Sequence, residues 1–315
     1  MSAPANVLEG VRAAEARRAS VGFWSDALWR LRHDPTTMAA LAVFGLMVLL
    51  AASADLLADH VFHTSFSKQD LFNTFRKPTL EEPALWFGAD NIGRSEIVRL
   101  LYGARVSLFI GIVASFVQLT LGMAVGITAG YFKGRWDDFV VWLISTLNGI
   151  PTLYLLIIVG LLFRLDPVSL VILIGLLGWT NEANLARGQT FAWRERDFVT
   201  AARTIGASPW RIMFRHIFPN ILPLMIVVSM ITVGGVILAE SALSYLGFGI
   251  QPPVPSWGNM LTGATGFYYK GPHLIVFPGV AISITVLCLF LIGDGLSDAL
   301  DPRLRGSTEV RGRSA

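Results

Sequence analysis

The stretch DFVTAARTIGASPWRIMFRHIFPNILP, residues 197 to 223, is a polar and basic segment between two long apolar runs. It begins with Asp197, a residue type that caps helix N-termini, and continues with apolar residues at helical spacing. Gly206 is the residue type that most often ends a helix in the left-handed conformation. Pro209 predicts a second helix start and Pro219 a second stop. The pattern therefore predicts two short helices on a membrane surface, joined by a glycine.

The composition is that of a membrane protein. The 315 residues are 53% hydrophobic and 15% charged, against roughly 25% charged residues in soluble domains. The single cysteine, Cys288, lies in an apolar run, which excludes a disulfide framework and a cysteine metal cluster. The net charge of +3 is explained by basic loops on one membrane face, so no nucleic-acid partner is expected. No lysine is followed by Ser or Thr, as a phosphate-binding loop requires, so this chain is not expected to hydrolyse ATP.

Six apolar runs are candidate membrane spans, for which roughly 20 residues are needed, although the fourth is shorter and continues as a polar helix. The runs are Met38–Leu57, Val106–Tyr131, Phe139–Phe163, Val168–Glu182, Ile221–Tyr245 and Leu274–Leu296. Basic residues concentrate on the face that holds both termini and residues 190–220, and the positive-inside rule places that face in the cytoplasm. The expected fold is an all-α integral membrane protein with six transmembrane helices.

Two runs contain residues that modify a plain apolar helix. Gly122, Gly126 and Gly130 recur every four residues, which leaves a groove for close helix packing by another backbone. The third run contains Asn148 and Pro151, which predict a kink with the asparagine facing protein or water instead of lipid.

The segment that begins at Asp197 resembles the EAA motif of ABC importer permeases, in which Glu-Ala-Ala is followed by Gly and, thirteen residues later, by Pro. Four positions match this motif: Ala201, Ala202, Gly206 and Pro219. Three positions depart from it: Thr200 in place of Glu, His216 in place of Ile and Phe218 in place of Leu.

Further stretches resemble the C-type permease of dipeptide, oligopeptide and nickel importers. Residues 86–108 are similar to its GTDxxGRD and YGARxSL signatures, with Ala89 where Thr is usual and Ser95 where Asp is usual. The segments that start at Glu240 and Gly293 are similar to two more signatures of that subfamily. The matches cover most of the chain beyond its first 35 residues, in the order and at the spacing of the family.

The resemblance implies one half of a transmembrane heterodimer with a B-type permease. Two ABC ATPase subunits would bind an EAA-type cytoplasmic coupling helix, and an extracytoplasmic solute-binding protein would deliver the cargo. ATP and Mg are expected in the ATPase subunits, and no catalytic residue, cofactor or metal is expected in this chain. The residues expected to couple to the ATPases are Ala201, Ala202, Arg203, Gly206, Ala207, Pro209, Arg215 and Pro219.

The expected location is a prokaryotic inner or plasma membrane, in contact with lipid. The predicted parts are a cytoplasmic tail with an interfacial helix, a first span with an extracytoplasmic loop, a core permease domain with its coupling loop, and a cytoplasmic C-terminal tail. Their bounds are residues 1–35, 36–105, 106–300 and 301–315. The expected cargo is peptides. Nickel or metal chelates and oligosaccharides stay open as alternatives, as does a secondary transporter without ATPase partners.

Four residues are candidates for the pathway or its gating. Polar groups inside a membrane are costly and often functional, which draws attention to Asn148, Glu240 and Asp294. For Glu240 and Asp294, lining a pathway and bonding a neighbouring helix remain equally open. The Gly- and Pro-rich segment 247–257 excludes a regular helix and ends in Trp257, a candidate anchor near the mouth of the pathway.

Overall fold

The computed structural model describes residues 23–300, and within this range the chain is helical, with one isolated bridge between Ala89 and Ser95 and no strand. The predicted all-α fold is confirmed. The predicted C-terminal tail and most of the N-terminal tail lie outside the described residues. The helices are α2 Phe23–His33, α3 Pro35–Ala52, α4 Ala54–His60, α5 Glu96–Phe132, α6 Gly134–Asn148, α7 Thr152–Leu162, α8 Pro167–Gly178, α9 Thr180–Arg194, α10 Asp197–Thr204, α11 Pro209–Ile212, α12 Phe218–Tyr245, α13 Trp257–Met260, α14 Ala264–Phe267 and α15 His273–Leu300.

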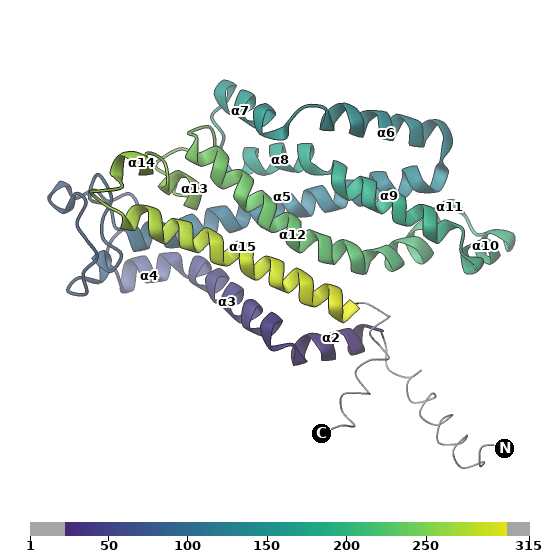
Figure 1. Ribbon diagram of the computed structural model, residues 1–315, viewed down its shortest axis with the longest axis horizontal. Coiled ribbons are helices and arrows are strands. Elements are labelled where there is room, and N and C mark those ends of the chain that lie inside the picture. Colours follow the sequence, from purple (N-terminus) through teal and green to yellow (C-terminus); the bar gives the residue numbers. More distant parts are fainter. Residues whose placement is uncertain (1–22, 301–315) are drawn as a thin grey trace, which may run out of the picture.

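The long helices run side by side along one direction, with α10 at one end and the long loop between α4 and α5 at the other (Figure 1). Four helical segments in the described range are long and apolar enough to cross a membrane: α3, α5, α15 and the segment Pro209–Tyr245. Two bent pairs, α6 with α7 and α8 with α9, each pass the same test together, at bends of 71° and 41°. The six predicted spans are present when each bent pair is counted as one. The kink expected at Asn148 to Pro151 is the bend between α6 and α7.

Two predicted helix boundaries are wrong at the end opposite α10. The first span does not run on to Leu57, because the helix breaks at Ser53. Arg105 accounts for this break, since its Nε and Nη2 donate to the carbonyls of Ala51 and Ala52 at 3.1 Å each. Helix α5 begins ten residues before its predicted start, because Ser95 caps it by accepting a hydrogen bond from the Val98 N–H.

The predicted stop at Pro219 is also wrong. The chain passes from α11 through a π-helical turn, Met213–Ile217, directly into α12. A proline lacks its N–H and its ring clashes with the carbonyl four residues earlier in a regular α-helix. The wider π turn removes that conflict, and Pro219 takes the first turn of α12, where a proline is tolerated. The predicted second surface helix is therefore the beginning of a continuous 37-residue helical segment.

Helix α5 is the centre of the bundle and packs against α3, α8, α9 and α12. The glycines 122, 126 and 130 on α5 face α9. A Cβ at Gly126 would lie 2.4 Å from the Ala183 carbonyl oxygen, and one at Gly130 would lie 2.8 Å from the Arg187 carbonyl oxygen. Two helix backbones are therefore in direct contact along this ridge, and α9 leads straight into α10.

Candidate functional site

Helix α10 is attached to the bundle by one face and exposed on the other. Val199 is fully buried and Ala202 is 8% exposed. Both belong to one apolar cluster with Tyr131 of α5, Ala186 of α9 and residues of α11 and the π turn. Just after the end of the helix, Ile205 is 86% exposed. The short helix thus contacts the ends of three long helical segments while it keeps a free surface.

The turn after α10 has the geometry that glycine permits. Gly206 has a φ of +82° and donates its N–H to the Arg203 carbonyl at 3.0 Å. The Ala207 N–H donates to the Ala202 carbonyl at 3.0 Å, and this pair of bonds is the Schellman motif that closes many helices. Ser208 then accepts a hydrogen bond from the Arg211 N–H, with Pro209 in the first turn of α11. The turn therefore fixes the angle at which α10 leaves the membrane-spanning segment.

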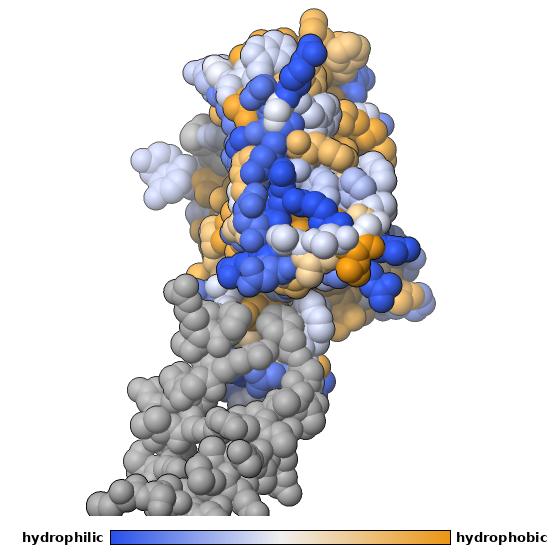
Figure 2. Space-filling model, turned by 90° about the vertical axis from the view of Figure 1, so that its right-hand side faces the viewer, coloured by the Kyte–Doolittle hydropathy of each residue, from blue (hydrophilic) through white to orange (hydrophobic). Residues whose placement is uncertain are grey.

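Charged residues near α10 contact the end of α5, and two arginines that follow α10 are exposed. Lys133 pairs with Glu195 at 3.2 Å, and its hydrogen bond holds the pKa of that carboxyl below its usual range. The Arg203 guanidinium lies 6.0 Å from the centre of the Tyr131 ring. Arg211 and Arg215 are exposed and form no ion pair within residues 23–300. Figure 2 shows that the α10 end of the molecule is largely hydrophilic with scattered apolar side chains.

The eight residues expected to couple to ATPases fall on one continuous segment from α10 to the first turn of α12. Ala202 is buried and Ala207 half-buried, so these two face the bundle. The others are exposed: Ala201, Arg203, Gly206, Pro209, Arg215 and Pro219.

Two of the four pathway candidates are internal. Glu240 is fully buried and accepts hydrogen bonds from the hydroxyls of Ser107 at 3.0 Å and Ser244 at 2.7 Å. Trp257 is 1% exposed, donates its ring N–H to the Leu100 carbonyl at 3.1 Å and donates its backbone N–H to Ser107. Trp257 thus ties the end of the Gly- and Pro-rich segment to α5, and Glu240 joins α12 to α5 through the same Ser107. That segment is non-helical up to residue 256, and Trp257 itself starts the short helix α13.

The other two candidates lie apart from this cluster. Asn148 stands at the bend between α6 and α7, and its side-chain oxygen accepts a hydrogen bond from Thr180 at 2.8 Å. Since Thr180 begins α9, this bond joins the breaks of the two bent pairs. Asp294 is exposed on α15. The structure therefore does not bring the four candidates together.

A partly polar cavity that the sequence did not predict lies between α5, α7, α8, α9 and α12, with a volume of about 350 Å³. Its wall includes Glu182, which is 3% exposed, and Thr232, which donates to Glu182 Oε1 at 2.8 Å. Gln118 also lines it and donates to the Ile174 carbonyl at 3.0 Å. The sequence shows an acidic residue, Glu182, at the end of an apolar run. That position alone does not distinguish a buried cavity residue from an ordinary residue at the membrane interface.

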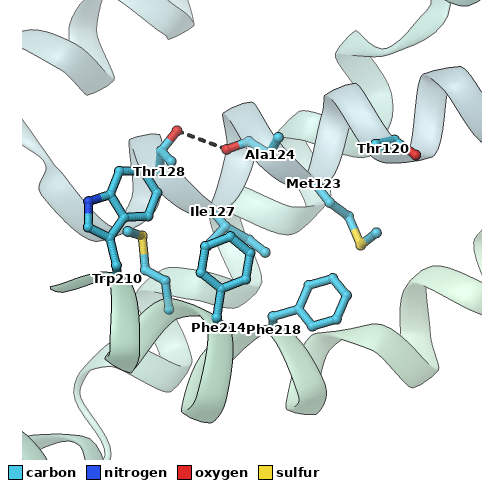
Figure 3. A pocket seen from close by; sticks show the side chains of 9 residues that line it. Thr120, Met123, Ala124, Ile127, Thr128, Trp210, Phe214 and Phe218 are labelled. Carbon is cyan, nitrogen blue, oxygen red and sulfur yellow. Dashed lines mark hydrogen bonds between the residues drawn. The ribbon is translucent and has the colours of Figure 1, made fainter. Parts of the chain in front are cut away.

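A second, apolar cavity of about 300 Å³ lies where α11 and the π turn meet α5 (Figure 3). Trp210, Phe214 and Phe218 line it on one side, opposite Met123 and Ile127 of α5. The hydroxyl of Thr128 donates to its own helix, at the Ala124 carbonyl. The lining is therefore an apolar contact surface beside α10 and offers little to hold a polar solute.

Comparisons with known proteins match most of the chain. The sequence pattern described as "Binding-protein-dependent transport system inner membrane component" matches residues 122–306. The pattern described as "N-terminal TM domain of oligopeptide transport permease C" matches residues 22–78.

Three similar relatives carry transport names. The oligopeptide transport system permease protein OppC of Bacillus subtilis (strain 168) is 33% identical over 93% of this chain and 94% of its own length. The dipeptide transport system permease protein DppC of the same organism is 35% identical over 93% of this chain and 90% of its own length. The glutathione transport system permease protein GsiD of Escherichia coli O6:K15:H31 is 34% identical over 90% of this chain and 91% of its own length.

Proposed function

The chain belongs to the family of binding-protein-dependent transport system inner membrane components, and on that premise we propose that it forms half of the pathway of an ATP-driven peptide importer. The observation that carries the proposal is α10 with its Schellman turn. It is an exposed helix fixed to the ends of α5, α9 and the α11–α12 segment, so a force on it reaches several spans.

Peptides are the cargo that the relatives favour. The three relatives described above are named for oligopeptides, dipeptides and glutathione, which is itself a tripeptide. These names favour peptides over nickel, metal chelates and oligosaccharides. The family name also favours delivery by a binding protein over a secondary transporter that works alone.

The partners are a B-type permease, two ATPase subunits and an extracytoplasmic binding protein. The B-type partner is supported by residues 149–151 and by Trp179, where the backbone breaks within the two bent spans. Irregular backbone at membrane depth is stable only where protein or a water-filled cavity covers it. A second permease against this side of the bundle would provide that cover. ATP and Mg would bind in the ATPase subunits.

The proposed orientation places both termini and α10 in the cytoplasm, and cysteine labelling tests it. The two test positions are Leu80, which is 88% exposed in the long loop, and Glu195, which is exposed beside α10. In a Cys288→Ser background, an impermeant thiol reagent added to intact cells should label Leu80→Cys and spare Glu195→Cys. Lysis should make both reactive. Labelling of position 195 with position 80 protected would invert the topology.

Uptake by a reconstituted assembly tests the transport function itself. Vesicles that hold this chain, the B-type permease and both ATPases should accumulate a labelled oligopeptide only with ATP at the ATPase side and the binding protein at the other. Assemblies that lack this chain should not. Uptake of nickel chelates or oligosaccharides in place of peptides, or uptake that ATP and the binding protein leave unchanged, would refute the proposal.

A further inference from the structure

The partly polar cavity between α5, α7, α8, α9 and α12 lies beside the bends of the two bent pairs, since Thr152 and Asn181 line it. Its volume of about 350 Å³ is within the roughly 300–1,000 Å³ that small-molecule sites occupy. Apolar side chains make up much of the wall, and the polar ones converge from four helices. The polar lining residues are Gln118, Thr152, Asn181, Glu182 and Thr232.

Glu182 has unused hydrogen-bonding capacity. Its Oε1 accepts from Thr232, but Oε2 is buried and has no partner within residues 23–300. A buried acceptor without a donor costs free energy, so a donor that reaches it is favoured. The α5 backbone packs tightly beside Glu182, because an added Cβ at Gly122 would lie 2.5 Å from Glu182 Cβ.

Two helices begin beside the cavity. Helix α7 begins at Thr152 and α9 at Thr180, and no side chain in the described part of the chain caps either N-terminus. Asn181 is exposed beside them. Because polar side chains and broken backbone at this depth are stable only against protein or water, the open side of the cavity faces away from lipid.

The charge of the site selects one end of a peptide. Glu182 lies in the first turn of α9 and lines the cavity. A second carboxylate would meet Glu182 with like charge, whereas an ammonium group offers donors to its unpartnered oxygen.

We propose that this cavity is a contact site for the ammonium group of the transported peptide, with Glu182 as its acceptor. This inference rests on the proposed peptide transport and assigns Glu182 as a specificity-determining residue of the pathway wall. Asn181 and Gln118 have amide groups suited to the adjoining peptide backbone.

Equilibrium binding to the complete assembly of this chain, the B-type permease and both ATPases tests the assignment, with no binding protein present. Two tripeptides with the same C-terminal fluorophore are compared, one with a free amino terminus and one N-acetylated. The wild-type assembly should bind the free peptide about tenfold more tightly, as expected for one charge-assisted hydrogen bond. Glu182→Gln, a change of nearly equal shape, should abolish that preference, and the matched control Glu195→Gln at the exposed α10 end should keep it.

The outcomes separate the assignment of Glu182 from the proposed peptide transport. No preference in the wild type, or a preference that Glu182→Gln retains, overturns the assignment. If Glu182→Gln prevents assembly, Asn181→Leu is used instead; it should fill the cavity from its exposed rim and weaken binding of both peptides, and unchanged binding overturns the proposal. The proposed function is tested separately. It fails if wild-type vesicles supplied with ATP and binding protein take up no free peptide.

Discussion

Gly126→Leu should prevent the bundle from assembling. A Cβ at this position would lie 2.4 Å from the Ala183 carbonyl oxygen, 2.9 Å from Ala186 Cβ and 3.0 Å from the Arg187 N–H nitrogen. Two of these three atoms are backbone, so no side-chain rotation relieves the clash and α5 must move away from α9. Overpacking in a close-packed interior costs about 1–3 kcal/mol even where side chains can yield, and here they cannot. The substitution therefore weakens packing along the whole α5–α9 contact.

Gly188→Leu is the matched control, because Gly188 lies on α9 and an added Cβ would have no atom of the described residues within 4 Å. Yield and co-purification with the B-type permease are measured by size-exclusion chromatography in detergent. We expect the wild-type yield of complex for Gly188→Leu and a tenth or less of that yield for Gly126→Leu. A tenfold loss corresponds to about 1.4 kcal/mol of assembly free energy. Normal assembly of Gly126→Leu would show that α9 does not pack on this ridge in the membrane.

The features of the fold that depend on local sequence were predictable. Gly206 ends α10 as its residue type indicates, and the bend at Pro151 follows from the missing N–H and the fixed φ of proline. Hydrophobic runs also identified the spans, because lipid demands continuous apolar surface.

The features that depend on tertiary contacts were not predictable. The break at Ser53 follows from Arg105, which is distant in sequence and takes the carbonyls at the end of α3. Pro219 does not stop its helix, because the preceding π turn removes the clash of its ring with the backbone. The presence of a proline in the sequence does not predict that turn. The hydrogen bonds of Glu240 likewise depend on tertiary contacts, since one of its serine partners is Ser107 of α5.

Glu182 was missed for the same reason. Its surroundings are assembled from five helices, and only the structure shows that one of its oxygens has no partner among residues 23–300. Asn148, by contrast, was recognised as polar within a span, but its partner Thr180 could not be read from the sequence.

Gly206→Val should separate ATP hydrolysis from transport. An added Cβ would meet no atom of residues 23–300 within 4 Å, so the substitution causes no steric clash there and acts through the backbone. The φ of +82° is one that a β-branched residue resists, at a cost of about 1–2 kcal/mol. The chain can relieve this strain by opening the Schellman turn, which breaks the bonds from Gly206 to Arg203 and from Ala207 to Ala202.

Opening this turn changes the angle between α10 and α11 but leaves the α5–α9 contact untouched. We therefore expect Gly206→Val to assemble with its partners and to bind the ATPases in a misaligned position. Gly206→Asn is the matched variant, because asparagine adopts the left-handed conformation at small cost, and it should stay close to the wild type. Gly188→Val controls for a valine in place of an exposed helical glycine.

The central claim is that α10 transmits the motion of the ATPases to the spans. Its most direct test measures peptide uptake and ATP hydrolysis on the same reconstituted complex for the wild type, Gly206→Val and Gly206→Asn. We predict that the number of peptides imported per ATP falls at least several-fold in Gly206→Val and stays near the wild-type value in Gly206→Asn, with ATP hydrolysis persisting in both. A wild-type ratio of uptake to hydrolysis in Gly206→Val would contradict the claim.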